Sequence, residues 1–293
     1  MIENEYLLPT QAPALPPILP GGPPIVQKIH ETGERTLWVV VVLMAVSSLC
    51  FYVLAARALV QKRLLHVLTA LITTISFLAY LALATGDGIT WSQCQYRQRH
   101  PQAPDTEKVV FRQVFWARYV NWGLTHPLIL INLALLAGSS GYSLLVAIAA
   151  DLIMFTTGLI ATFARHERRW AWYTITCIAY LTVAYHVLFN GRRAVANKSQ
   201  QTQRFFGSIA LTALVITALY PIILAASPLA HKISLDAEVI AWAILDILTQ
   251  GIFGYWLLLT LDNSDTTSVY ADGFWAFGHG TEGSIRVGDH EEA

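Results

Sequence analysis

Seven long stretches of this chain contain almost no charged residues. Each is 21 or more residues long, and together they hold only three of the 38 charged side chains. A helix rises about 1.5 Å per residue, so about 20 residues cross the roughly 30 Å hydrocarbon core of a bilayer. Backbone groups in lipid must be hydrogen-bonded within their own segment, which favours helices. The sequence therefore predicts an all-α membrane protein, a bundle of seven transmembrane helices over residues 36–56, 64–86, 114–137, 142–164, 170–190, 205–230 and 239–261.

The remaining segments divide the chain into three parts. Residues 1–35 hold seven of the twelve prolines and are predicted to be a disordered N-terminal tail. Residues 36–261 are the predicted transmembrane domain, and residues 262–293 a polar C-terminal tail. The longest connection, residues 87–112, carries both signs of charge and is expected to be a loop. Lysine and arginine are similarly frequent on the two sides, so the positive-inside rule does not fix the orientation.

The composition excludes several classes of function. Charged residues make up 13% of the chain and the net charge is zero, whereas soluble domains average about 25% charged residues. A neutral chain does not favour nucleic acid, and three cysteines are too few for a disulfide scaffold. The sequence shows no phosphate-binding loop, catalytic triad or metal-ligand spacing. We therefore expect neither an enzyme nor a metal protein.

Polar side chains gather on one face of the third and of the seventh stretch. Asp246 and Gln250 are four residues apart in the seventh stretch and share a helical face. A buried charge is costly without a partner, so Asp246 is predicted to form an ion pair with Arg118. Asp151, in the fourth stretch, has no obvious cation. The face of the third stretch carries, by i, i+3 and i+4 spacing, Arg118, Asn121, Trp122, Thr125 and Asn132.

These polar groups have two interpretations. Interhelical hydrogen bonds contribute about 0.6–2 kcal/mol each, so the groups could simply hold helices together. Two opposite charges in the middle of a bundle instead favour a functional site. His126 is also open to two readings, a pH-sensing group or a neutral packing residue. Five tryptophans are assigned to membrane interfaces or lipid-facing surfaces: Trp116, Trp170, Trp172, Trp242 and Trp256.

The order and spacing of several motifs resemble the microbial (type I) rhodopsins, and most closely the fungal branch. The resemblance covers about residues 36–261 and all seven stretches. It implies the rhodopsin type of seven-helix bundle, with a vestigial retinal pocket lined by Tyr119, Asn121, Trp122, Thr125, Met154, Gly158, Tyr220, Pro221, Asp246 and Gln250. The motifs that carry it are Arg118-Tyr119, Trp122, Thr125 and Pro127-Leu128, then Asp151, Met154 and Thr157-Gly158, then Tyr220-Pro221, and finally Leu245-Asp246, Gln250 and Phe253-Gly254.

The departures from the family pattern bear on function. Gln250 stands where the family has the lysine that binds retinal covalently, and an amide cannot supply that amine. Asn121 and Asn132 stand at the positions that accept and donate protons in pumping members, and asparagine does not titrate. Thr217 and Leu224 replace two tryptophans that flank retinal in the family. The resemblance therefore implies a protein without covalent retinal, and we expect no cofactor.

The predicted function is an opsin-like, non-photoactive, stress-related chaperone or regulator of proton homeostasis in the plasma membrane. Its N-terminus is expected outside and its C-terminus in the cytoplasm. Expected partners are the lipid bilayer and other membrane proteins such as a proton-pumping ATPase, or a second copy of the chain. The alternatives are a light-driven ion transporter or photoreceptor that holds retinal non-covalently, or a passive ion pathway. A weaker variant is a receptor for another apolar molecule in the vacated retinal volume.

Overall fold

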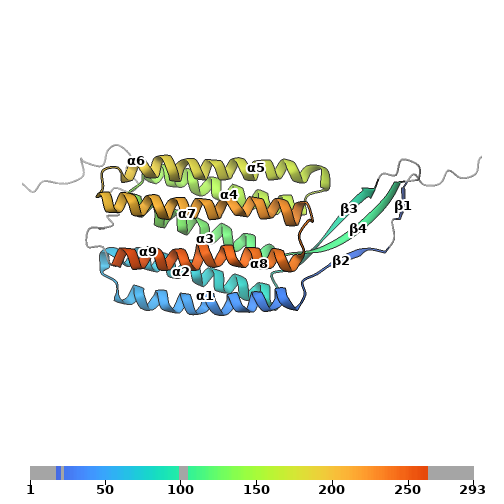
Figure 1. The fold of residues 1–293 in the computed structure, drawn as a ribbon, viewed down its shortest axis with the longest axis horizontal. Coiled ribbons are helices and arrows are strands. Elements are labelled where there is room, and N and C mark those ends of the chain that lie inside the picture. Colours follow the sequence, from blue (N-terminus) through green and yellow to red (C-terminus); the bar gives the residue numbers. More distant parts are fainter. Residues whose placement is uncertain (1–17, 21–22, 99–104, 263–293) are drawn as a thin grey trace, which may run out of the picture.

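The computed structural model describes residues 18–20, 23–98 and 105–262. Within these residues, seven helical spans are long and apolar enough to cross a membrane, and they lie side by side as a bundle (Figure 1). This confirms the predicted all-α, seven-helix membrane fold. The spans are Glu31–Arg57, Lys62–Thr85, Trp116–Ala137, Gly141–Phe163, Glu167–Val195, Gln200–Leu229 and Leu235–Asp262.

The first four spans are single α-helices, and each of the last three contains a wider π-helical segment. The single helices are α1 (Glu31–Arg57), α2 (Val60–Thr85), α3 (Trp116–Ala137) and α4 (Gly141–Phe163). The fifth span consists of α5 (His166–Tyr185), η1 (His186–Asn190) and α6 (Gly191–Val195), and the sixth of α7 (Gln200–Leu224) and η2 (Ala225–Leu229). The seventh consists of α8 (Leu235–Asp246), η3 (Ile247–Ile252) and α9 (Phe253–Asp262). Segments of π-helix are frequent at functional sites, and η3 contains Gln250.

Local chemistry sets several helix ends. Gly86 and Gly138 end α2 and α3 with φ angles of 92° and 71°, in the left-handed region that glycine adopts without a Cβ penalty. The ammonium of Lys198 donates to the carbonyl oxygen of Leu136 at 3.0 Å, which satisfies one free carbonyl at the end of α3. Burial lowers the pKa of Lys198. Ser199 caps the start of α7 by accepting from the backbone N–H of Thr202.

A small sheet extends from the end of the bundle where α1 begins (Figure 1). Strands β3 (Thr90–Gln98) and β4 (Asp105–Val114) form an antiparallel hairpin. Two short strands, β1 (Ile18–Pro20) and β2 (Ile25–Gln27), pair with β4 in parallel. The predicted loop over 87–112 is therefore largely a hairpin.

The predicted boundaries of the N-terminal tail also change. α1 starts at Glu31, inside the region assigned to the tail, and β1 and β2 also fall within it. β1 and β2 have three residues each, which is too short for an alternation of apolar and polar residues to be recognised in the sequence. The rest of the predicted N-terminal tail, residues 1–17 and 21–22, and the predicted C-terminal tail from residue 263 lie outside the described residues.

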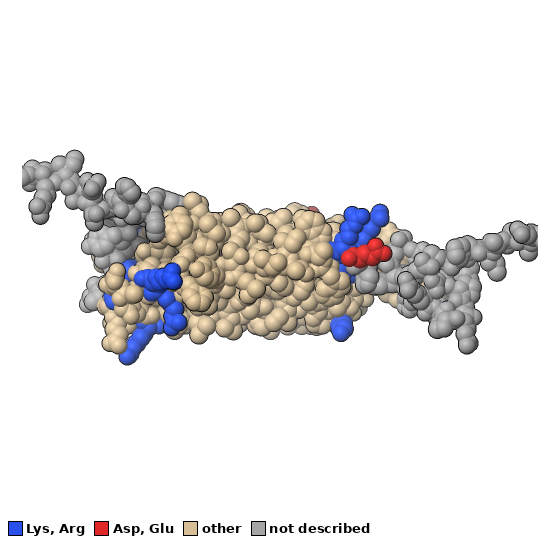
Figure 2. Space-filling model, turned by 90° about the horizontal axis from the view of Figure 1, so that it is seen from above, with Lys and Arg blue, Asp and Glu red and all other residues tan. Residues whose placement is uncertain are grey.

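The outer face of the bundle is apolar over its middle, and Lys and Arg side chains lie towards its two ends (Figure 2). Exposed aliphatic residues such as Leu49, Ile178 and Leu181 face outward from mid-span. A soluble protein could not expose so much continuous apolar surface. The surface therefore fits a protein embedded in a bilayer, which leaves the polar side chains of the interior as the candidates for function.

Candidate functional site

Asp246 lies in the centre of the bundle and accepts hydrogen bonds from three other helices. Its carboxylate accepts from the Tyr80 hydroxyl on α2 at 2.5 Å and from the indole N–H of Trp122 on α3 at 2.8 Å. A third bond comes from the Tyr220 hydroxyl on α7, also at 2.8 Å. Asp246 itself is fully buried. Because buried acceptors need partners, this carboxylate links four helices of the bundle.

Arg118 does not form the predicted ion pair with Asp246. Among the described residues, its ion-pair partner is Glu238 on α8, with 3.9 Å between Nη1 and Oε1. The guanidinium lies over the Phe115 ring, 5.1 Å from the ring centroid. Three donors from Tyr80, Trp122 and Tyr220 already occupy the oxygens of Asp246, so the carboxylate does not need the arginine. Arg118 and Asp246 are both buried, but the ion pair of Arg118 is formed with Glu238.

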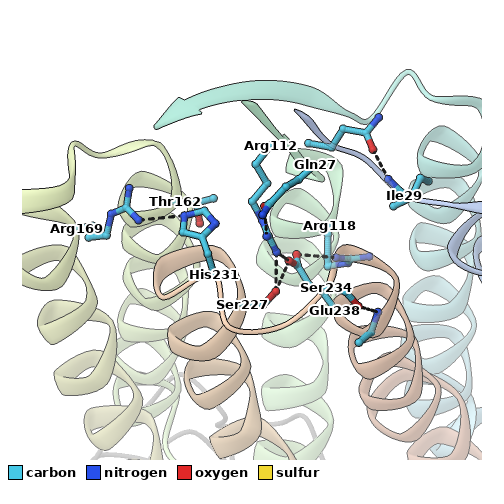
Figure 3. A network of polar contacts seen from close by, with 12 residues as sticks. Gln27, Ile29, Arg112, Arg118, Thr162, Arg169, Ser227, His231, Ser234 and Glu238 are labelled. Carbon is cyan, nitrogen blue, oxygen red and sulfur yellow. Dashed lines mark hydrogen bonds and ion pairs between the residues drawn. The ribbon is translucent and has the colours of Figure 1, made fainter. Parts of the chain in front are cut away.

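Glu238 belongs to a second polar network, which joins the sheet to the end of the bundle (Figure 3). Nη2 of Arg112, on β4, lies 2.6 Å from Oε2 of Glu238 and donates to the Ser227 hydroxyl at 2.8 Å. Ser227, in η2, in turn donates to Glu238 at 2.6 Å. Nη1 of Arg112 donates to the side-chain oxygen of Gln27 on β2 at 2.7 Å. The network therefore fastens two strands to the sixth and seventh spans.

Arg112 and Glu238 are site residues that the sequence pattern does not predict. Each lies just before an apolar stretch that holds a single charge, and the sequence places each in a connection between spans, yet both are buried. One signal was available: Glu238 precedes Asp246 by eight residues, which places the two carboxylates on the same face of a helix. Arg112 offered no comparable signal, because only the pairing of β4 brings it over the bundle.

Replacing Arg112 by methionine (R112M) should destabilise the protein by about 3–5 kcal/mol, because it leaves the buried Glu238 carboxylate without its cation. The matched control is R35M, since Arg35 forms an exposed pair with Glu31 within α1. Exposed pairs contribute at most about 1 kcal/mol. Thermal unfolding of the purified full chain in detergent would compare the two. Equal melting temperatures for R112M and R35M would contradict a structural role for the network.

Gln250 lies in a compact cluster of polar side chains from three spans. Its side-chain oxygen accepts from the Ser76 hydroxyl on α2 and from the Asn121 amide on α3, the latter at 3.3 Å. Its side-chain nitrogen donates to the Thr125 hydroxyl at 3.2 Å, and Thr125 donates to the backbone oxygen of Asn121. All four side chains are buried. The structure thus brings together Asn121, Thr125 and Gln250, as the sequence analysis expected of a pocket.

Asn132 lies outside this cluster. Its amide donates to the Thr69 hydroxyl on α2 at 3.3 Å. Asn132 is eleven residues beyond Asn121 on α3, which corresponds to about 16 Å along a helix. Asn121 and Asn132, the two predicted proton-relay positions, therefore form separate polar contacts in different parts of the core.

Aromatic rings form the other wall of the predicted pocket. The ring of Trp122 packs against Tyr119, Tyr220, Phe155 and Trp242, with centroid separations of 4.7–5.4 Å. Trp242 is only 1% exposed, so its assignment to an interface or lipid-facing surface is wrong. Its position one helical turn before Asp246 turns it inward with that residue. Phe155 and Trp242 are additions to the predicted pocket.

The remaining predicted pocket residues lie close to these rings. Met154 is buried in the same apolar cluster as Trp122 and Tyr220, and Pro221 is buried beside Tyr220 in α7. A Cβ on Gly158 would lie 3.3 Å from Leu224 and 3.6 Å from Tyr119. Glycine therefore allows α4 to approach the side chain of Leu224, one of the two positions predicted to replace a tryptophan.

A cavity of about 80 Å³ lies between the third, sixth and seventh spans, on the side where Thr217 stands. Its walls come from α3, α7, η3 and α9 and are mostly apolar. It is smaller than typical small-molecule sites, which measure about 300–1,000 Å³. The lining residues are His126, Ile129, Thr212, Ala213, Ile216, Thr217, Leu248, Thr249, Ile252, Phe253 and Trp256.

Known proteins resemble this chain over most of its length. Opsin-1 of Neurospora crassa is 41% identical over 94% of this chain and 92% of its own. Halorhodopsin of Natronomonas pharaonis is 32% identical over 75% of this chain and 77% of its own. The crystal structure of the light-driven proton pump LR (Mac) from Leptosphaeria maculans is 43% identical, covers 82% of this chain and 98% of that one, and superposes with a TM-score of 0.80.

These similarities overturn the expectation that the chain has no cofactor. A protein 43% identical to it is a light-driven pump, and a protein driven by light needs a group that absorbs light. In the family to which the motifs point, that group is retinal, so a retinal cofactor is expected.

The described residues fit such a group in part. The aromatic rings around Trp122 suit a polyene. The covalent anchor does not fit, because no lysine occurs between Leu235 and Asp262 and the five lysines of the chain lie elsewhere: Lys28, Lys62, Lys108, Lys198 and Lys232.

The match to the family itself is broad. The model of the family described as "Bacteriorhodopsin-like protein" matches residues 32–264, which include all seven spans. The seven-helix bundle, the central aspartate and the aromatic pocket around Trp122 are the structural counterparts of that match. This chain is a member of the bacteriorhodopsin-like family of integral membrane proteins.

Proposed function

We propose that this protein is a membrane photoreceptor that holds retinal without a covalent bond. The observation that carries the proposal is the aromatic pocket inside the bundle, where four rings pack around the indole of Trp122. It adjoins the position from which a family member would hold retinal, and it is lined by apolar side chains. Retinal, when bound, supplies the absorption of visible light, and the residues of this chain supply the walls that hold and orient it.

The polar residues favour a photoreceptor over a proton pump. A pump needs groups that take up and release protons along the bundle, and asparagine does neither at positions 121 and 132. Asn121 is bonded within the Gln250 cluster and Asn132 is bonded to Thr69. Asp246 is held by three hydrogen-bond donors. The light-driven pumping of the relative from Leptosphaeria maculans is therefore not proposed for this chain.

The arrangement of the core also opposes a passive ion pathway. Beyond the Gln250 cluster, towards the end of the bundle away from the sheet, the interior is a large apolar cluster that includes Leu133, Leu136, Phe206 and Leu257. Asn132 and Thr69 form a local pair among these apolar side chains. An ion entering this region would lose its hydration without gaining polar partners.

Incubation of the full chain in detergent with all-trans retinal should shift the visible absorption band from that of free retinal. It should also induce circular dichroism in that band, since a fixed chiral pocket orients the polyene. The intact mass of the denatured protein should stay unchanged, because the seventh span contains no lysine. The control is the same mixture after heat denaturation of the protein. A spectrum identical to that of free retinal would refute the proposal and favour a non-photoactive protein.

We also propose that the protein lies in the plasma membrane with its N-terminus outside and its C-terminus in the cytoplasm. A stress-related role through a membrane partner such as a proton-pumping ATPase, or through a second copy of the chain, is proposed on the resemblance to fungal opsin-like proteins. Co-purification from native membranes, with identification of the captured proteins, tests both kinds of partner.

A further inference from the structure

The end of the bundle away from the sheet carries a strong excess of positive charge. Figure 2 shows Lys and Arg side chains at this end with no Asp or Glu beside them in that view. Among the described residues, seven lysines and arginines lie at this end but only one carboxylate, Asp262. Five of the seven are exposed arginines around the α1–α2 and α6–α7 connections, here called the arginine face: Arg57, Arg63, Arg192, Arg193 and Arg204.

The other polar groups at this end are already engaged. The ammonium groups of Lys62 and Lys198 donate to the carbonyl oxygens at the ends of α9 and α3. The carboxylate of Asp262 lies 3.3 Å from Nε2 of His66, on α2. Within the described part of the chain, no carboxylate forms an ion pair with the arginine face. Its guanidinium groups are therefore available to a negatively charged occupant.

The chain itself continues from this end with an acidic segment, residues 263–293. α9 ends at Asp262, whose contact with His66 places the exit of the chain beside α2 and the α1–α2 connection. The segment has one basic residue, Arg286, and six acidic ones: Asp265, Asp272, Glu282, Asp289, Glu291 and Glu292. Its net charge is therefore −5, whereas seven basic residues and one carboxylate give the end of the bundle a net charge of +6. The two charges are opposite and nearly equal.

We infer that the acidic segment binds to the arginine face of its own chain. Carboxylates form charge-assisted and often bidentate hydrogen bonds with guanidinium groups. Each exposed pair contributes little alone, but attachment at Asp262 raises the effective concentration of the segment at this end. Anionic lipid headgroups carry the same charge but lack that attachment.

The segment is also long enough to reach every part of the arginine face. The 20 residues from Asp262 to Glu282 span up to about 70 Å when extended, and a helix is only about 10 Å across. The bound segment keeps anionic lipids and acidic partner proteins away from the same arginines. This inference does not depend on the binding of retinal.

The test places the photo-crosslinking residue p-benzoylphenylalanine at position 285, in place of Ile285, in the full chain. The protein is held in nanodiscs that contain phosphatidylcholine and phosphatidylserine, and mass spectrometry locates the crosslinks formed under ultraviolet light. They should map to residues 57–63 and 192–204 of the same chain. Their yield should fall several fold when the salt concentration rises from about 0.1 M to about 1 M, since the Debye length then falls from about 10 Å to about 3 Å.

Neutralising the acidic segment leaves the described part of the chain unchanged and removes the attraction. The crosslink yield should therefore fall about tenfold, since every exposed pair is lost, in the variant D265N, D272N, E282Q, D289N, E291Q and E292Q. Removing part of the arginine face, with R192Q, R193Q and R204Q, should also lower the yield. The matched control removes three exposed basic residues at the sheet end of the bundle and should crosslink like wild type: R165Q, R168Q and K232Q.

The other possible results contradict the inference. Crosslinks to phosphatidylserine alone would assign the arginine face to anionic lipid. Crosslinks to a second copy of the chain would replace binding within one chain by binding between chains. No crosslink to the arginine face, or an undiminished yield after neutralisation of the acidic segment, would overturn the inference directly.

Discussion

Replacement of Gln250 by lysine (Q250K) should allow the protein to bind all-trans retinal covalently. The new amine would lie four residues after Asp246, on the same helical face, and among the partners that now hold the amide of Gln250: Ser76, Asn121 and Thr125. The expected readouts are a gain in intact mass equal to retinal less one water, and a visible band at longer wavelength than in wild type. Q250M, which has similar length and no amine, should show neither.

Q250K should nevertheless fail to pump protons under light. Asn121 lies 3.3 Å from the oxygen that the substitution would replace, and it cannot accept a proton. The pH of a suspension of liposomes containing Q250K should therefore stay constant under illumination. Light-driven proton transport by this single variant would contradict the functional assignment of Asn121. Absence of any mass gain would instead show that the pocket no longer admits retinal next to position 250.

Replacement of Asp246 by alanine (D246A) should be among the most destabilising changes in the bundle. It leaves the hydroxyls of Tyr80 and Tyr220 and the indole N–H of Trp122 buried without an acceptor. Each buried donor without a partner costs about 1–3 kcal/mol. We expect a loss of several kcal/mol in the free energy of unfolding, measured by thermal unfolding in detergent and by the yield of folded protein.

Two variants separate the causes of that loss. D246N keeps an acceptor oxygen and should be less destabilised than D246A, which isolates the contribution of the hydrogen bonds from that of the charge. D87A, in the turn after α2, removes an exposed carboxylate and should change stability little. A melting temperature for D246A equal to that of wild type would contradict the central role assigned to this carboxylate.

The seven-helix fold was predictable because it depends on local quantities. The length of an apolar stretch and the rise of a helix set the number of crossings, whatever the helices pack against. The pocket residues Trp122, Met154 and Tyr220 were found through motif spacing, and the structure brings them into one cluster. These features need no knowledge of how distant segments meet.

The partner of Arg118 was not predictable in the same way. Glu238 and Asp246 both lie on one face of the seventh span, eight residues apart, so helical spacing alone cannot choose between them. The choice depends on Tyr80 and Tyr220, which come from two other helices and satisfy Asp246 first. The contact between Arg112 and Glu238 joins residues 126 positions apart, and it forms only because the β3–β4 hairpin brings Arg112 to the end of the bundle. Such long-range pairings leave little trace in the local pattern of a sequence.

The pairing of β2 with β4 requires the start of α1 and the end of α2 to lie on the same side of the membrane. β2 precedes α1, whereas β4 follows α2, and the register joins Ile25 to Val110 and Gln27 to Arg112. Both strands must reach the same side of the membrane, so α1 and α2 must each cross it once. A chain in which only one of these two helices crosses the membrane cannot complete the sheet, and Gln27 cannot reach Arg112. The sheet at this end of the bundle can therefore form only after α1 and α2 have both inserted across the membrane.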